Sequence, residues 1–343
     1  MPSLLGALVG DCEIEALFSD EADLAAMLRT EAALAAAEAE AGLVSVEAAA
    51  RIAAVCAVFR PDRDDLAQGV ARDGVVIPAL IAQLRAAVGV PHADAVHRGA
   101  TSQDIIDTSL ILRLKPALDL LERRLDAIGT ALATLGIAEG ARPLLAHTRM
   151  QAALPFTVAD KIATWAAPLM RHKARLAEIR PRLLVVQLGG PVGTRAELAG
   201  QGDAVTRALA GRLDLGAAPP WHSQRDAIVE CGGWFALVSG TFGKIGQDIA
   251  LLAQSEVGAV RIAGAGASSA MAHKRNPVAA EILVALARFN AGLSGTLQQA
   301  LVHENERSGA AWTLEWMVLP PMAVTAGASL RMASRLLKEL SFA

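Results

Sequence analysis

The chain of 343 residues contains no tyrosine, and its few aromatic side chains make up only 3% of it. The absence of tyrosine excludes every mechanism that needs a tyrosine acid, base or nucleophile. The three cysteines, Cys12, Cys56 and Cys231, lie far apart and have no metal-ligand spacing. An odd number of scattered cysteines is typical of a reduced protein, so we expect a cytoplasmic chain without disulfides.

The sequence also lacks a block of like charge, because 32 Lys and Arg residues nearly balance 35 Asp and Glu residues. Such a chain is not expected to bind nucleic acid or a membrane surface. The first basic residue is Arg29, so no charged signal-peptide start precedes it. Although 53% of the residues are hydrophobic, apolar runs such as 183–186 and 234–238 fall far short of the roughly 20 residues of a membrane span.

The hydrophobic residues instead follow a helical period. In 225–260 they recur at spacings of three and four along about 36 residues, or about 54 Å of helix, which indicates a heptad seam. A shorter seam of the same kind follows at Ile282, Leu286, Phe289 and Leu293. The residues of the first seam are Ile228, Cys231, Phe235, Val238, Phe242, Ile245, Ile249 and Leu252.

Further helices are predicted over 20–57, 78–88, 105–138 (with a kink at Pro116) and 155–179. No segment alternates with period two for long enough to indicate a sheet. We therefore predict an all-α protein with a small N-terminal helical lobe, 1–104, and a central long-helix bundle domain, 105–343. Helices of this length do not fit in a compact monomer of this size, so some seams are expected to pair between subunits.

Four polar segments can carry chemistry. Residues 264–277 join small residues, two hydroxyls and a lysine, with Asn276 and Pro277 as an expected cap of the next helix. Such a loop can hold an anion and activate a serine, but a flexible connector has the same composition. Residues 97–104 can bind a carboxylate at a helix N-terminus or simply start a helix.

The other two segments are 147–151, at the mouth of an apolar helix, and 303–307. The first can bind substrate or be a solvated loop. The second lacks the second histidine of an HExxH metal motif, because position 307 is arginine. It is by default a solvated charge cluster, and we expect neither a metal nor an organic cofactor.

Together these segments resemble the fumarase/aspartase superfamily of helical lyases over roughly residues 90–320. The mobile loop of that family, GSSxMPxKxNP, is matched by residues 267–277. The resemblance implies a homotetramer around a long helical bundle, with active sites shared between subunits. Relatives usually continue into a third helical domain, so this chain, ending at Ala343, is expected to have no full C-terminal domain.

The resemblance also implies residue roles. Ser268 aligns with the general base that removes a proton beside a carboxylate, and Lys274 aligns with a group that holds the developing aci-carboxylate, since such charge must be neutralised. His97 aligns with an acid/base histidine, or it only orients the substrate. The expected substrate-binding residues are Thr101, Ser102, Arg149, Gln151, Arg225, Ser269, Asn276 and Arg307.

One departure from the family pattern bears on the reaction. Lyases of the family carry THxQ where this chain has Thr148 to Gln151 with Arg149 in place of the histidine. An amine leaving group needs a proton from that histidine, whereas a carboxylate, with a pKa of about 4, attacks or leaves as the anion. The change favours lactonisation. A resemblance to the cycloisomerases of this superfamily implies that the substrate is a small muconate tricarboxylate of protocatechuate breakdown (the β-ketoadipate pathway).

Two alternatives remain open from the sequence. An adenylosuccinate-type lyase would use His97 as its acid, but Trp312 and Trp316 stand where those lyases bind a phosphate with serine and arginine. Segments 187–194 and 306–316 resemble the cycloisomerases instead. A non-catalytic scaffold of the same fold is the other alternative, and intact Ser268 and Lys274 argue against it.

Overall fold

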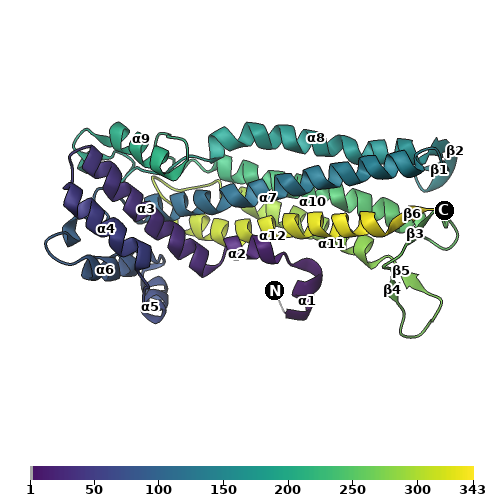
Figure 1. Cartoon of the computed structure of the whole chain (residues 1–343), viewed down its shortest axis with the longest axis horizontal. Helices are drawn as coiled ribbons and strands as arrows, with labels where there is room; N and C mark the ends of the chain where they lie inside the picture. Colours follow the sequence, from purple (N-terminus) through teal and green to yellow (C-terminus); the bar gives the residue numbers. More distant parts are fainter. Residues whose placement is uncertain (1–2) are drawn as a thin grey trace.

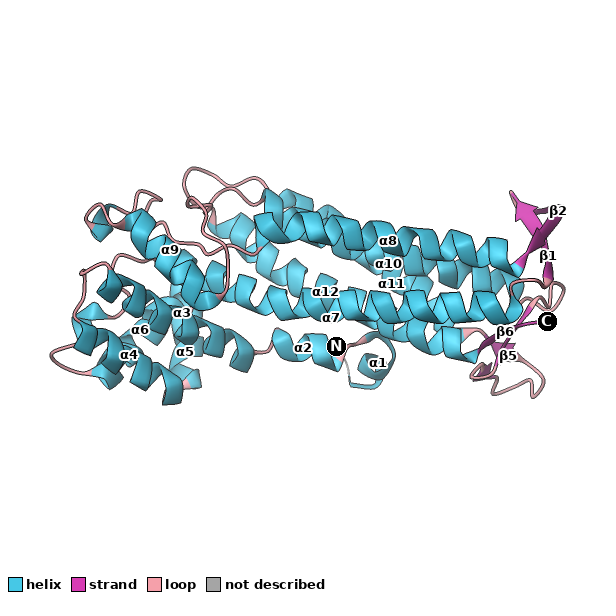
Figure 2. Ribbon diagram, turned by 45° about the horizontal axis from the view of Figure 1, so that its top comes forward, coloured by secondary structure: helices cyan, strands magenta, loops and turns pink. Residues whose placement is uncertain are grey.

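The computed structural model describes residues 3–343. Long helices run side by side along the molecule, most of the shorter helices gather at one end, and short strands lie at the other end (Figures 1 and 2). The predicted all-α class is confirmed. The lobe end is where α3 (Asp20–Glu40), α4 (Val46–Val58), α6 (Ile77–Val88) and α9 (Gly202–Leu213) lie, and the hairpin end is where the strands lie.

Five long helices form the bundle and enclose its apolar core. All eight residues of the seam predicted in 225–260 are buried in this core, so the seam packs within the chain. The helix ends at Leu252, short of the predicted Val260, and residue 260 starts a strand. The bundle helices are α7 (Ser102–Glu139), α8 (Val158–Leu183), α10 (Asp226–Leu252), α11 (Val278–Gln299) and α12 (Gly309–Glu339).

The lobe has a second core of its own, to which α9 contributes from the middle of the sequence. The helix predicted over 20–57 is broken in two, because Gly42 adopts φ 73° and Ser45 caps the next helix by accepting from Ala48 N. The shorter elements are α1 (Ser3–Val9), α2 (Cys12–Leu17), α3 (Asp20–Glu40), α4 (Val46–Val58), α5 (Arg63–Asp73), α6 (Ile77–Val88), η1 (Ala93–Ala95), η2 (Ala196–Leu198) and α9 (Gly202–Leu213).

Three short antiparallel strand pairs were not indicated by the sequence pattern. Pro155, predicted to start a helix, lies in a strand, and α8 begins only after Thr157, whose Oγ1 accepts from Asp160 N. The pairs are β1 (Pro143–Thr148) with β2 (Gln151–Thr157), β3 (Val260–Ile262) with β6 (Leu340–Phe342), and β4 (Gly266–Ala267) with β5 (Arg275–Asn276).

Helix α11 presents an open apolar face. Its most apolar 18-residue window has a mean hydropathy of 1.3, yet only 22% of that window is buried, and by length and composition this one described helix could cross a membrane. Here it packs against α10 and α12 through Leu283, Leu286 and Leu297, which are buried. On the other side Phe289 is 44% exposed. The second predicted seam is thus only half buried within the chain.

Candidate active site

The expected site residues lie at the two ends of the molecule. His97, Thr101 and Ser102 lie just before or at the start of α7, at the lobe end. Arg149 lies between β1 and β2, and Ser268 between β4 and β5, and these strands are at the hairpin end (Figure 1). The 38 residues of α7 separate the first group from the β1–β2 hairpin by about 57 Å. A single chain therefore does not bring the expected residues into one site.

The N-terminus of α7 is held by a buried carboxylate. Asp104 accepts hydrogen bonds from the backbone N–H of Thr101 (2.9 Å), Gly189 (2.8 Å) and Gly190 (2.9 Å). His222 Nε2 lies 2.9 Å from Asp104 Oδ1. Asp104 was missed as a site-forming residue, although its place three residues after Thr101 is the signature of a capping box.

Arg307 lies beside this helix start. Its Nε donates to Gln103 Oε1 at 2.7 Å, and its Nη2 donates to the carbonyl of Pro191 at 3.2 Å. Gln103 is itself buried and donates to the carbonyl of His222 at 2.8 Å. A half-buried, oriented guanidinium beside the start of α7, where Thr101 and Ser102 lie, can bind a carboxylate.

His97 is held by a buried glutamate that the sequence did not indicate. Its Nδ1 lies 2.7 Å from Oε1 of Glu31 on α3, and 14% of the His97 side chain stays exposed. Burial lowers the pKa of His97, but the charge and hydrogen bond of Glu31 outweigh it, with help from Asp104, so the net pKa lies above its usual value. The backbone of His97 is left-handed, at φ 63°, which is uncommon for a non-glycine residue.

Arg225, expected to bind substrate, is instead part of the protein interior. Its side chain is 0% exposed and pairs with two carboxylates, Asp107 at 2.6 Å and Glu315 at 2.5 Å, which are also 0% exposed. The ring of Trp221 covers the guanidinium at 4.8 Å. The expectation is corrected because no substrate can reach a cation that is enclosed and satisfied by the fold.

The two tryptophans of α12 lie in the same region. Trp312 is buried and its Nε1 donates to Asp107 Oδ1 at 3.0 Å, and its ring centroid lies 4.4 Å from that of Trp316. Trp312 thus packs against the ion pairs of Arg225. Neither Trp312 nor Trp316 provides a cation that could bind a phosphate.

At the hairpin end, Arg149 and Gln151 belong to the tight turn of the β1–β2 hairpin. Thr148 pairs with Gln151, and Arg149 and Met150 between them have φ values of 50° and 67°. Two left-handed residues form the two-residue turn that matches strand twist. The turn displays the exposed Arg149 on the rim of a cavity of about 530 Å³ that Lys161 and Asp248 also line.

The loop with Ser268 projects from the same end. Ser268 is half-buried, and its Oγ accepts from the backbone N–H of Ala270 (3.3 Å) and Met271 (3.1 Å). Ser269 and Lys274 are exposed. Donors aimed at a hydroxyl oxygen favour its anionic form, and within residues 3–343 no side chain hydrogen-bonds this oxygen.

Asn276 does not cap α11 as expected. It lies in β5 and pairs with Gly266 of β4, and Pro277 takes the capping position. The two-residue ladder closes the base of the loop, which leaves Ser268 to Lys274 as the projecting part. The N-cap of this helix therefore lies one residue later than predicted, at Pro277 instead of Asn276.

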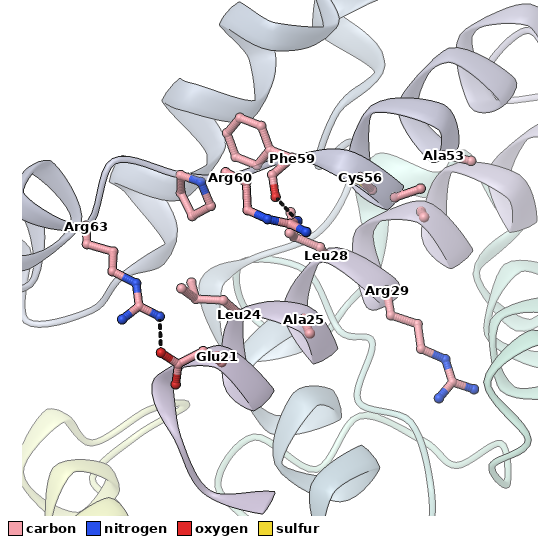
Figure 3. A pocket seen from close by; sticks show the side chains of 13 residues that line it. Glu21, Leu24, Ala25, Leu28, Arg29, Ala53, Cys56, Phe59, Arg60 and Arg63 are labelled. Atoms are coloured by element: carbon pink, nitrogen blue, oxygen red, sulfur yellow. Dashed lines mark hydrogen bonds and ion pairs between the residues drawn. The ribbon is translucent and has the colours of Figure 1, made fainter. Parts of the chain in front are cut away.

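Two other kinds of site can be considered within residues 3–343, namely a metal site and a groove away from the expected residues. Residues 3–343 contain no group of three His, Cys, Asp or Glu side chains placed to hold a metal ion. A groove of about 650 Å³ lies between α3 and α4, where Arg29, Arg60 and Arg63 surround an apolar floor (Figure 3). Arg63 pairs there with Glu21 at 2.6 Å.

Comparison with known proteins identifies the fold's relatives. The family model described as lyase matches residues 13–289. A 3-carboxy-cis,cis-muconate cycloisomerase from Pseudomonas aeruginosa is 43% identical over 335 residues, which cover 95% of this chain and 73% of the relative.

Solved structures agree. The 3-carboxy-cis,cis-muconate lactonizing enzyme from Pseudomonas putida superposes with a TM-score of 0.93 at 41% identity, covering 99% of this chain and 77% of that one. A fumarate lyase from Mesorhizobium sp. BNC1 gives 0.91 at 36% identity, covering 97% and 76%. With matched sequence, matched fold and a family model spanning most of its length, the chain belongs to the lyase family of the fumarase/aspartase superfamily.

Proposed function

We propose that this chain is an isomerase that interconverts 3-carboxy-cis,cis-muconate and a carboxymuconolactone. The observation that carries the proposal is the 41% to 43% identity with proteins named for this reaction, joined to Arg149 at the turn where lyases of the family carry histidine. An arginine cannot give up a proton near neutral pH. It can instead bind the carboxylate of a tricarboxylate substrate.

The proposed mechanism is an intramolecular addition. One substrate carboxylate oxygen forms a C–O bond to an alkene carbon, and the π electrons move to the neighbouring carbon and its carboxylate as an aci-carboxylate. Ser268 then gives a proton to that carbon and regains one from solvent, so lactone formation consumes one proton. In the reverse direction the Ser268 alkoxide, favoured by the N–H groups of Ala270 and Met271, removes this proton.

The cations stabilise the developing charge. In this scheme Lys274, in the same loop as Ser268, and Asn276, at the base of that loop, neutralise the aci-carboxylate when the loop covers substrate. Arg149 and Gln151 extend from the hairpin turn, and Arg307, Thr101 and Ser102 bind the remaining carboxylates at the start of α7. No metal or organic cofactor takes part in this scheme.

The proposed site is shared between subunits of a homotetramer. A small tricarboxylate cannot span the roughly 57 Å of α7, so the lobe end of one copy must meet the hairpin end of others. The open face of α11 supports such an assembly, because it continues into an apolar groove of about 960 Å³ with Leu237 and Leu301. Burying this face between copies accounts for the high hydrophobic content without a membrane.

The alternative is a lyase that releases fumarate, favoured by His97, which the Glu31 pair could make an acid. Mixing purified protein separately with 3-carboxymuconate and adenylosuccinate and following ultraviolet absorbance tests the two. Turnover of 3-carboxymuconate is expected. Turnover of adenylosuccinate alone would refute the proposal, and turnover of neither would favour a non-catalytic scaffold.

A further inference from the structure

Two glutamates on one face of α3 lie in the interior behind His97. Glu31 is 1% exposed, and Glu38, two turns further along the helix, is 0% exposed. Glu31 uses Oε1 to bind His97, while its Oε2 and both carboxyl oxygens of Glu38 are buried without a hydrogen-bond partner among residues 3–343. Buried polar atoms without partners are rare in folded proteins, so this cluster needs an explanation.

The charges around the cluster do not balance two carboxylates. His97 faces Glu31 from the lobe, Asp104 from α7 and Arg85 from α6. Within residues 3–343, the charges that act on Glu38 are those of Glu31 and Arg98, and Arg98 is exposed and donates to the carbonyl of Leu43 at 2.7 Å. Burial, together with the charge of Glu31, raises the pKa of Glu38 to about 8.

A third titratable group near Glu31, the thiol of Cys56, is neutral. Cys56 of α4 is buried, and burial and the nearby Glu31 charge raise the pKa of its thiol to about 12. One negative charge, on Glu31, and one positive charge, on His97, therefore make the cluster neutral when Glu38 carries a proton. A buried pair is stable in this form, whereas two unpaired carboxylates are not.

We propose that Glu31 is a positioning residue that holds His97 as a cation with Nε2–H directed at the active site, and that Glu38 stays protonated so that the Glu31 charge serves His97 alone. The substrate contact of His97 rests on the proposed function. Glu31 accepts from Nδ1–H, which leaves Nε2, unpartnered among the described residues, as the outward donor. In this role His97 binds a substrate carboxylate and transfers no proton.

The first test is an NMR titration of the histidines, which needs no substrate. Wild-type His97 is expected to titrate above the ordinary value of 6.5, and Glu31→Gln is expected to lower its pKa by about one unit or more. Glu40→Gln, an exposed change at the end of the same helix, is expected to leave it unchanged. His172, whose pKa burial lowers to about 4, serves as the internal reference.

Equal His97 titrations in wild type and Glu31→Gln would overturn the positioning role. If Glu31→Gln does not fold, the pKa of His97 is compared between Glu31→Asp and the wild type instead. A wild-type His97 that titrates at or below 6.5 overturns the proposal as well.

The second test concerns the proton on Glu38. Infrared spectra of wild type at pH 6.5 are expected to contain a C=O stretch of a buried carboxylic acid that disappears in Glu38→Gln and above pH 9. Identical carboxylic-acid bands in wild type and Glu38→Gln would show that Glu38 is ionised, which contradicts the proposal.

The third test links the cluster to the reaction. With 3-carboxymuconate at pH 7.5, Glu31→Gln is expected to raise KM about tenfold with a smaller change in kcat, and the defect is expected to shrink at pH 6, where solvent protonates His97. Glu31→Asp should restore part of the loss. A loss confined to kcat, or one independent of pH, argues against a cationic His97. If wild type does not turn this substrate over, the proposed function fails while the titrations still decide the Glu31 and Glu38 assignments.

Discussion

The two ends of the molecule differ in how they hold their polar residues. At the lobe end Asp104, Arg225 and Glu31 are buried and bound by partners far apart in the sequence. At the hairpin end Arg149 and Lys274 are exposed, and the half-buried Ser268 is held only by backbone N–H groups of its own loop. The lobe end thus holds its polar groups in a preorganised arrangement, while the hairpin end presents its polar groups on projecting loops.

Buried polar pairs and exposed polar loops thus lie at opposite ends of the bundle. The preorganised end is expected to contribute mostly to substrate affinity and stability, whereas the projecting end is expected to contribute to the rate of proton transfer. Changes at the two ends should therefore have different signatures.

The largest effect is expected at the hairpin end. Ser268→Ala should lower kcat with 3-carboxymuconate by about 10³-fold, because alanine has no hydroxyl to transfer the proton and, within residues 3–343, no other side chain hydrogen-bonds Ser268 Oγ. The unfolding temperature should not change, since Ser268 makes only local contacts. Ser255→Ala, an exposed change at the same end, is the control. A loss below about tenfold would contradict the assigned role.

The next effect is on stability at the lobe end. Arg225→Met leaves Asp107 and Glu315 buried without a cation, and should lower the free energy of unfolding by about 3–5 kcal/mol. The matched change at the hairpin end, Arg335→Met, breaks an exposed pair with Glu339 and should cost less than about 1 kcal/mol. Denaturant titration measures both, and similar values would remove the contrast between the ends.

A smaller effect is expected for His97. His97→Ala should raise KM about tenfold and change kcat by less than about threefold, because the lost group binds substrate and transfers no proton. Steady-state kinetics beside Ser268→Ala measure the split. Equal losses of kcat in the two variants would show that the leaving-group argument from Arg149 is wrong.

The last expected effect is a pH dependence of stability. The pKa of Glu38 is raised from 4.5 to about 8 in the folded protein, so its contribution is fully present below pH 4.5 and is lost as pH rises through 8. Relative to wild type, Glu38→Gln should therefore gain stability from pH 5 to 8, by up to about 1.4 kcal/mol per pH unit. Glu40→Gln should give no such trend, and parallel profiles for Glu38→Gln and wild type would contradict the buried proton.

The long helices were predictable because their buried residues recur every three or four positions, as in the α10 seam. The β1–β2 hairpin was not, since its strands are mostly exposed and have no buried face to impose an alternating pattern. The break between α3 and α4 had a signal in Gly42, which the helix-forming composition around it obscured.

At the site, local motifs pointed to the serine loop and to the start of α7. The partners of Arg225 and His97 could not be predicted, because Asp107 is 118 residues from Arg225 in the sequence and Glu31 is 66 from His97. A sequence pattern records which residues are polar along one element. Which of them become buried pairs is decided by the packing of distant elements.

The central claim is that one site takes residues from opposite ends of different copies. Ser268→Ala lacks the proton-transfer group, and Arg307→Ala lacks a carboxylate-binding cation, so each is expected to have low activity when 3-carboxymuconate is far below KM. Under this condition, activity should return when the two variants are co-expressed with different tags and isolated as mixed oligomers. Some sites in such oligomers combine an intact loop from one copy with an intact Arg307 from another. Activity well above that of either variant alone is the predicted result, and mixed oligomers no more active than their parents would contradict the claim.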